Sequence, residues 1–249
     1  MADDLDLRHQ LASSFGAAAT AYAEYRPGYP ATALEWALAP VAKQKQLHVL
    51  DLGAGTGKLT EALVKAGIQV TAVEPDQAML SELRRRLPDV AAHVGVAEEI
   101  PLPDGTVDAV LAGQALHWFE PERALPEIAR VLRPGGVLAG LWIAYDGRVE
   151  WVAELDRLFP GRLCFAAQQA MRGHEAYGTL ESAEFPYTQQ RTAESLTATL
   201  ATHSPVLVLP AEEQKRVLGH IRAYLDSLPG VDENFTVPLI TAVERVVIR

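Results

Sequence analysis

The chain has 249 residues, of which 49% are hydrophobic and 22% charged, and its formal net charge is −10. This acidic balance argues against DNA or bulk RNA as a substrate, because nucleic-acid affinity depends largely on lysine and arginine neutralising phosphates. The single cysteine, Cys164, excludes a disulfide within the chain and a cysteine-based zinc site. No apolar stretch approaches the roughly 20 residues that cross a bilayer, and the first residues lack the apolar core of a secretion signal. We therefore expect a cytoplasmic protein with no membrane and no nucleic-acid partner.

The first part of the chain predicts two helices and then a buried strand. Apolar side chains recur at helical spacing over about residues 5–25, and the prolines and glycine within residues 27–30 must end that helix. A second helix is expected over about residues 31–42. The apolar run over residues 46–52 ends at glycines, which is typical of a buried strand that leads into a tight turn.

Strand-like and helix-like patterns then alternate. Helices are expected at about 57–66, 76–87 and 121–132, and strands at 69–74, about 92–96, 107–113 and 137–143. Five strands with intervening helices predict right-handed crossovers and an α/β, doubly wound, Rossmann-like parallel sheet.

The pattern is looser beyond residue 144. We expect one or two helices over 148–182, a strand over 185–192, two helices over 193–228 and a last strand over 235–248. The two late strands could pair as an antiparallel edge of the same sheet. The expected organisation is one domain, with cap helices (1–45), a ligand-binding core (46–144), a helical region with one strand that shapes an acceptor pocket (145–235) and the last strand (236–249).

The strongest chemical signal is the run Val49–Gly57, with the sequence VLDLGAGTG. A buried strand carries Asp51 near its end, and alternate glycines then open a helix, so that the backbone can turn sharply and a ligand can approach the helix N-terminus. A dinucleotide site expects G-x-G-x-x-G, whereas the spacing here is G-x-G-x-G. Asp51 would repel a pyrophosphate but suits an ammonium group. The run therefore favours S-adenosylmethionine (SAM), which carries an α-ammonium and a sulfonium, over NAD.

Glu74 lies at the end of the second expected strand, roughly 20 residues beyond the glycine loop. An acid at this place can accept hydrogen bonds from both hydroxyls of a ribose. The alternative is a solvated carboxylate at a strand end. Asp76 is expected to cap the next helix.

Two further loops follow the third and fourth expected strands. In the first, the backbone of Ala97 and Glu98 could read the edge of an adenine. The second contains His117 and lies at the carboxyl end of a strand, where open α/β sheets bind ligands. His117 is the best candidate for a general base because its ordinary pKa is near neutral. Two alternatives stay open, a residue that only lines the pocket and a structural histidine, since methyl transfer can proceed by alignment alone. The other histidines show no metal-ligand spacing, so no metal is expected.

These motifs in this order resemble the class I SAM-dependent methyltransferases, most closely the type 11 methyltransferase domain. The resemblance rests on DLGAGTG (51–57), Glu74, Ala97-Glu98, PLPD (101–104), QALHWF (114–119) and LRPGG (132–136). The opening segment, from Phe15 to Tyr25-Arg26-Pro27-Gly28-Tyr29-Pro30, is similar to a subgroup related to the trans-aconitate methyltransferases. The basic residues of the C-terminal half, Arg148, Arg162, Arg172 and Arg191, are scattered, which argues against the polyanionic substrate of that subgroup.

The resemblance implies a seven-stranded, mostly parallel sheet with an antiparallel last strand and a helical cap. It implies that SAM is held by Tyr22, Arg26, Asp51, Gly53, Ala54, Gly55, Glu74, Pro75, Ala97, Glu98 and Gln114, with Tyr22 and Arg26 folding over the cofactor and Arg26 pairing with its carboxylate. We therefore expect an enzyme, a monomer or homodimer, that methylates a small molecule, at oxygen rather than carbon or nitrogen, and releases S-adenosylhomocysteine (SAH). The alternatives are a non-catalytic SAM-binding protein and a nicotinamide-dependent oxidoreductase, which the glycine spacing and Asp51 disfavour.

Overall fold

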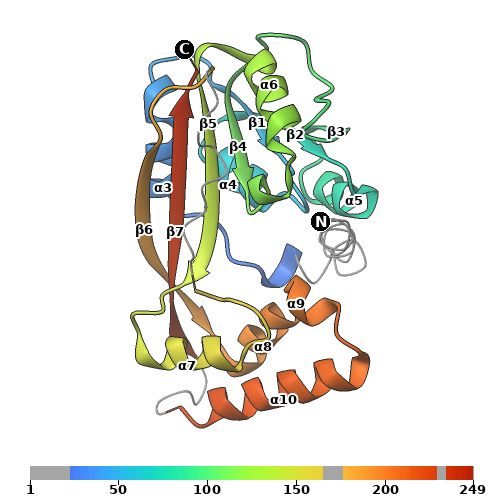
Figure 1. Ribbon diagram of the computed structural model, residues 1–249, viewed down its shortest axis with the longest axis vertical. Coiled ribbons are helices and arrows are strands. Elements are labelled where there is room, and N and C mark those ends of the chain that lie inside the picture. Colours follow the sequence, from blue (N-terminus) through green and yellow to red (C-terminus); the bar gives the residue numbers. More distant parts are fainter. Residues whose placement is uncertain (1–22, 165–175, 229–233, 249) are drawn as a thin grey trace. The chain divides into compact units, whose positions relative to one another are not determined.

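A computed structural model describes residues 23–164, 176–228 and 234–248 (Figure 1). Its elements up to the fifth strand are α3 (Ala31–Leu38), the 3-10 turn η2 (Ala39–Val41), β1 (His48–Leu52), α4 (Lys58–Lys65), β2 (Gln69–Glu74), α5 (Gln77–Arg86), β3 (Ala91–Val94), β4 (Val107–Gly113), the 3-10 turn η3 (Leu116–Trp118), α6 (Pro121–Val131) and β5 (Leu132–Tyr145). They are followed by α7 (Glu150–Leu158), β6 (Glu181–Arg191), α8 (Ala193–Ala201), α9 (Ser204–Leu207), α10 (Ala211–Asp226) and β7 (Phe235–Val247).

The alternation expected over residues 46–143 is confirmed, and the differences have local causes. β5 begins at Leu132 rather than 137, because Leu132 already pairs with Val107 of β4 and Gly135 turns at a φ of +77° without ending the strand. A third short helix, α9, appears within 193–228, with Pro205 in its first turn, where proline is tolerated. Of the helix expected over 5–25, only residues 23–25 are described, and they are helical.

The seven strands form one sheet in the order β3-β2-β1-β4-β5-β7-β6. β1 pairs in parallel with β2 on one side and β4 on the other, and β2–β3 and β4–β5 are also parallel. The arrows in Figure 1 show β7 running opposite to β5 and β6. The predicted mostly parallel sheet with an antiparallel strand at the end of the chain is confirmed.

Helices cover both faces of the parallel strands. Successive side chains of a strand point to opposite faces, and in these strands both sets are mostly apolar and need to be buried. One face packs against α3 and α4, through a core that includes Leu34, Leu63, Val49 and Leu111. Ala72 lies two residues after Val70 of the same core, so it shares this face, where it packs with Leu83 of α5. α6 connects β4 to β5, which extend the sheet in the opposite direction, and it lies on the other face (Figure 1). β1, β2 and β4 are buried along nearly their whole length, as expected of central parallel strands.

The described residues divide into two compact units. The larger unit contains residues 28–142, 176–185 and 241–248, and the smaller contains 23–27, 143–164, 186–228 and 234–240. The smaller unit has a core of its own, which includes Val152, Leu196, Leu200, Ile221 and Leu239. The expected single-domain organisation stays a prediction. Within the described ranges, no helix is both long enough and apolar enough to span a membrane.

Candidate functional site

The candidate site lies in the larger unit, at the carboxyl ends of three neighbouring strands. β1 lies between β2 and β4, and Asp51 of β1 is in register with Ala72 and Leu111. The loop after β1 stays bound to the end of β2, because the N–H groups of Gly53 and Ala54 both donate to the carbonyl of Val73, at 2.9 and 3.1 Å. The glycine loop and the end of β2 are therefore one structure, at the edge where open α/β sheets bind ligands.

Glycine is required at both ends of this loop. Gly53 has a φ of +72°, and a Cβ at that position would lie 2.6 Å from the Cβ of Ala115. Gly57 caps α4 at a φ of +86°, and a Cβ there would lie 2.9 Å from Cγ of Leu83. Both residues thus combine a left-handed backbone with a close approach to a neighbour, which only glycine accepts without strain.

Asp51 is a buried carboxyl group whose two oxygens lie in different surroundings. Its side chain is 1% exposed, and Oδ2 accepts a 2.5 Å hydrogen bond from the hydroxyl of Thr60. Within the described part of the chain, Oδ1 has no hydrogen-bond partner. Burial raises the pKa of Asp51 to about 7, and the nearby Glu74 contributes to the rise. Because a buried acid with an unsatisfied oxygen is costly, the site suits a ligand that brings a cation or a donor to that oxygen.

Glu74 is not the solvated strand-end carboxylate that the sequence left open, since it is 7% exposed. Its Oε2 accepts a hydrogen bond from the N–H of Gly55 at 2.8 Å, and its Oε1 accepts one from the N–H of Asp76 at 2.9 Å. Burial raises the pKa of Glu74, and these two backbone donors partly offset the rise. Each carboxylate oxygen can accept a second hydrogen bond, so Glu74 holds the glycine loop and keeps capacity for a ligand.

Asp76 caps α5 as predicted, since its Oδ1 accepts a 2.9 Å hydrogen bond from the N–H of Met79. Pro75, one of the expected cofactor contacts, lies between Glu74 and this cap. The cap therefore fixes the direction in which the chain leaves the end of β2.

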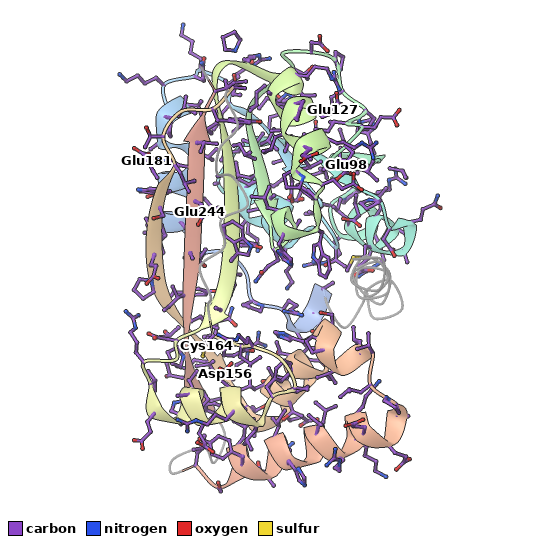
Figure 2. The ribbon with its side chains drawn as sticks, viewed as in Figure 1. Glu98, Glu127, Asp156, Cys164, Glu181 and Glu244 are labelled. Carbon is purple, nitrogen blue, oxygen red and sulfur yellow. The ribbon has the colours of Figure 1, made fainter. Side chains whose placement is uncertain are left out.

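The loop after β3 turns sharply and contacts α6. Val96 and Glu99 pair in an isolated antiparallel bridge, and Ala97 between them is 4% exposed. The carboxylate of Glu98 accepts a 2.8 Å hydrogen bond from the N–H of Glu120, the N-cap residue of α6. Figure 2 labels Glu98 together with Glu127 of that helix, whose Oε2 accepts the N–H of Ile100 in the same loop. The predicted adenine contact by Ala97 and Glu98 thus rests on backbone atoms, because the Glu98 side chain contacts α6.

The loop after β4 carries a strained residue. Gln114 has a φ of +57°, and elsewhere in the described ranges positive φ values occur only at glycines. Its N–H donates to the carbonyl of Leu141 at 2.8 Å. Strain of this kind often marks a ligand site. His117 follows in η3, with its ring centroid 4.8 Å from that of Trp118. The role of His117 as a base stays a prediction.

Of the two residues expected to fold over the cofactor, only Arg26 lies in the described part of the chain. Tyr22 lies outside the described residues. Arg26 belongs to the smaller unit, where its Nε donates to Oγ1 of Thr202 at 3.0 Å and its Nη2 to the Thr202 carbonyl at 3.1 Å. Its pairing with a SAM carboxylate therefore stays a prediction. Arg191, one of the basic residues that are scattered in the sequence, contacts a distant segment of the chain. Its Nη2 donates to the carbonyl of Tyr25 at 2.6 Å.

Sequence reasoning missed three residues that support the site, Thr60, Glu127 and Arg130. No signal marked Thr60 as the partner of Asp51. Glu127 and Arg130 have the i, i+3 spacing of an ion pair on a helix, which was visible in the sequence but did not reveal their target. Over the described ranges, no three histidine, cysteine or acidic side chains gather as a metal site would require.

Comparison with known proteins agrees with this geometry. Residues 50–140 match the methyltransferase domain family. An uncharacterized methyltransferase of Mycobacterium tuberculosis is 40% identical over 240 residues, which cover 96% of this chain and 97% of the relative. The malonyl-[acyl-carrier protein] O-methyltransferase of Pectobacterium atrosepticum is 32% identical over 178 residues, covering 67% of this chain and 70% of its own. A solved structure from Anaeromyxobacter dehalogenans, described as a candidate type II methyltransferase, superimposes with a TM-score of 0.66 at 25% identity, covering 89% of this chain and 97% of that one.

The chain therefore belongs to the class I SAM-dependent methyltransferases. The finer relation to the trans-aconitate subgroup stays a prediction.

Proposed function

We propose that this protein is an enzyme that binds SAM in the larger unit and transfers its methyl group to an oxygen of a small molecule, releasing SAH. The observation that carries the proposal is the pair of buried acids at the carboxyl edge of the sheet. Asp51 has one oxygen without a described partner, and Glu74 is bonded to the glycine loop through Gly55. Both groups lie at the edge where open α/β sheets bind ligands.

The chemistry of these donors and acceptors fits SAM part by part. Asp51 is suited to the α-ammonium, because a cation beside it would stabilise its ionised form. The remaining lone pairs of Glu74 are suited to the ribose hydroxyls. The backbone of Ala97 and Glu98 would face the adenine, and the loop that contains Gln114 and His117 would flank the reactive end. SAM supplies an electrophilic methyl group on a sulfonium, and the residues named here bind and orient it.

The expected source of rate acceleration is alignment. Holding a nucleophilic oxygen in line with the methyl group converts a bimolecular encounter into a unimolecular step. His117 is the candidate to accept the proton that an alcohol or phenol would lose; a carboxylate acceptor would need no base. Oxygen is favoured as the target because the relative from Pectobacterium atrosepticum is named an O-methyltransferase.

Two other functions compete with this one. A nicotinamide-dependent oxidoreductase is disfavoured because Asp51, ionised above its pKa of about 7, would repel a pyrophosphate. A non-catalytic SAM-binding protein would use the same cofactor contacts without an acceptor.

Acceptor-dependent turnover separates the enzyme from the binding protein. The purified chain would be incubated with SAM and panels of carboxylic acids, alcohols, phenols and amines, and SAH would be quantified against a reaction without acceptor. We expect SAH formation with an oxygen acceptor and a product that is 14 mass units heavier, the net gain of one CH₂. A chain that binds SAH yet transfers to no member of any panel would favour the binding protein, and an N-methyl product would overturn the choice of oxygen.

A further inference from the structure

The loop after β3 is held by one arginine of α6. Nη2 of Arg130 donates to the carbonyl of Ile100 at 2.9 Å, and Nη1 donates to the carbonyl of Leu102 at 2.8 Å and to Oδ1 of Asp104 at 2.7 Å. A guanidinium has its donors in a fixed plane, so one side chain can hold several acceptors in a defined arrangement. Arg130 thus bonds to three successive alternate residues of the loop.

Glu127 fixes the orientation of this arginine and adds a bond of its own. Its two carboxylate oxygens accept hydrogen bonds from Nε and Nη2 of Arg130, both at 2.8 Å. Oε2 also accepts the N–H of Ile100 at 3.0 Å. The hydrogen bond from Arg130 is the main cause of the lowered pKa of Glu127, so the pair is ionised at neutral pH. The pair therefore engages both the N–H and the C=O of Ile100.

Two more contacts complete the attachment of the loop to α6. The N–H of Glu120 bonds to the carboxylate of Glu98, and the N–H of Gly105 donates to the carbonyl of Arg130 at 2.9 Å. The side chains of Arg130 and Glu127 are 30% and 24% exposed, so the network is partly shielded from water. The stretch from residue 98 to 105 is bonded to α6 at each end and in its middle, and Ala97 lies directly before it.

We propose that Arg130 and Glu127 are positioning residues for adenine recognition. They would hold the loop after β3 in the conformation that presents the backbone of Ala97 and Glu98 to the base. Binding then requires little ordering of the loop, and a smaller ordering cost means higher affinity. The inference rests on the proposed function, because it assumes that this loop flanks the adenine of SAM.

The test compares two ligands that share the adenosine group. SAH carries the α-ammonium and the adenosine, whereas 5′-methylthioadenosine carries the adenosine alone. For Arg130→Ala we expect the calorimetric affinity to fall by roughly tenfold for both ligands. Without the arginine the loop after β3 must be ordered when the ligand binds, and this ordering costs binding free energy. For Asp51→Asn we expect SAH affinity to fall and methylthioadenosine affinity to stay. Arg123→Ala is the matched control, since Arg123 lies on the same helix and forms an exposed ion pair with Glu120.

Hydrogen exchange at the Ile100 amide provides a readout without ligand. We expect faster exchange at residues 98–104 in Arg130→Ala, with unchanged protection in β1 and β4. If Arg130→Ala does not fold, Glu127→Gln serves as the second variant, because glutamine keeps the shape of the side chain. We expect it to lower the affinity for both ligands, by less than Arg130→Ala. Unchanged methylthioadenosine affinity in these variants would overturn the inference. A wild-type chain that binds neither ligand would instead contradict the proposed function on which it rests.

Discussion

Replacing Asp51 by asparagine should stabilise the protein at alkaline pH while weakening cofactor binding. The carboxyl has a pKa of about 7 in the folded chain against 3.8 for the free group. Between these values the folded state keeps a proton that the unfolded state has released, so stability falls as pH rises through this window and the loss is complete above pH 7. A shift of this size corresponds to about 4 kcal/mol. Asparagine is neutral at every pH and avoids this cost.

The net gain should be smaller, because the new amide is not fully satisfied either. Asparagine can still accept the hydroxyl of Thr60, but its NH₂ group would stand at the position of Oδ1, which has no described partner. An unsatisfied buried donor costs about 1–3 kcal/mol. We therefore expect Asp51→Asn to be more stable by about 1–3 kcal/mol at pH 8, a rise in melting temperature of about 2–6 °C for a chain of this length. At pH 5.5, about halfway through this window, the ionisation cost is only about 2 kcal/mol and the amide penalty offsets it, so the gain should be near zero.

The assay is thermal unfolding of both proteins at pH 5.5, 7 and 8, with Asp108→Asn as a control. Asp108 is also a buried aspartate of the sheet, but its oxygens bond to Arg133 and to the N–H of His48. Asparagine would lose the charge that pairs with Arg133 and would set an NH₂ group against one of these two donors, so Asp108→Asn should lower the melting temperature at all three pH values. A lower melting temperature for Asp51→Asn at pH 8, or a difference that does not change with pH, would refute the reasoning.

Other predictions concern the ligand and the loops. SAH affinity should rise from pH 6 to 7 and level off above pH 7, because the α-ammonium favours ionised Asp51 and binding below pH 7 releases a proton. Calorimetry at pH 6 in two buffers that differ in ionisation enthalpy would detect the released proton, and its absence would remove Asp51 from the ammonium site. Glu74→Ala should weaken SAH binding at least tenfold, roughly the loss of two hydrogen bonds, and unchanged affinity would contradict the ribose assignment. His117→Ala should lower turnover more than SAH affinity, and the reverse would make it a cofactor contact. Gly53→Ala should lower the melting temperature, since its Cβ would lie 2.6 Å from Ala115; an unchanged value would show that the loop can rearrange.

The fold could be predicted where the chain's pattern is local. Buried runs such as β1 and β4 alternate with amphipathic helices, and that alternation alone indicates a doubly wound sheet. The cap at Asp76 follows from residue type and position. The start of β5 could not be predicted in this way. Pro134 and Gly135 are typical of a turn between elements, and the strand continues through them because Leu132 already pairs with β4.

The site could be predicted as a set of positions, but not as a set of contacts. The glycine spacing and Glu74 mark two neighbouring parts of the proposed ligand site. Nothing in the sequence shows that Glu74 bonds to Gly55, or that Thr60 bonds to Asp51, since both contacts depend on how a loop folds back in space. The same holds for Arg130, whose three loop acceptors lie 26 to 30 residues earlier in the chain.

The most direct test of the central claim is a calorimetric titration of the purified chain with SAM, SAH and NAD at pH 8. The account predicts one site that binds both adenosyl ligands in the micromolar range and shows no heat with NAD. Binding of NAD without SAM or SAH would contradict the proposed cofactor and the role assigned here to each residue of the site.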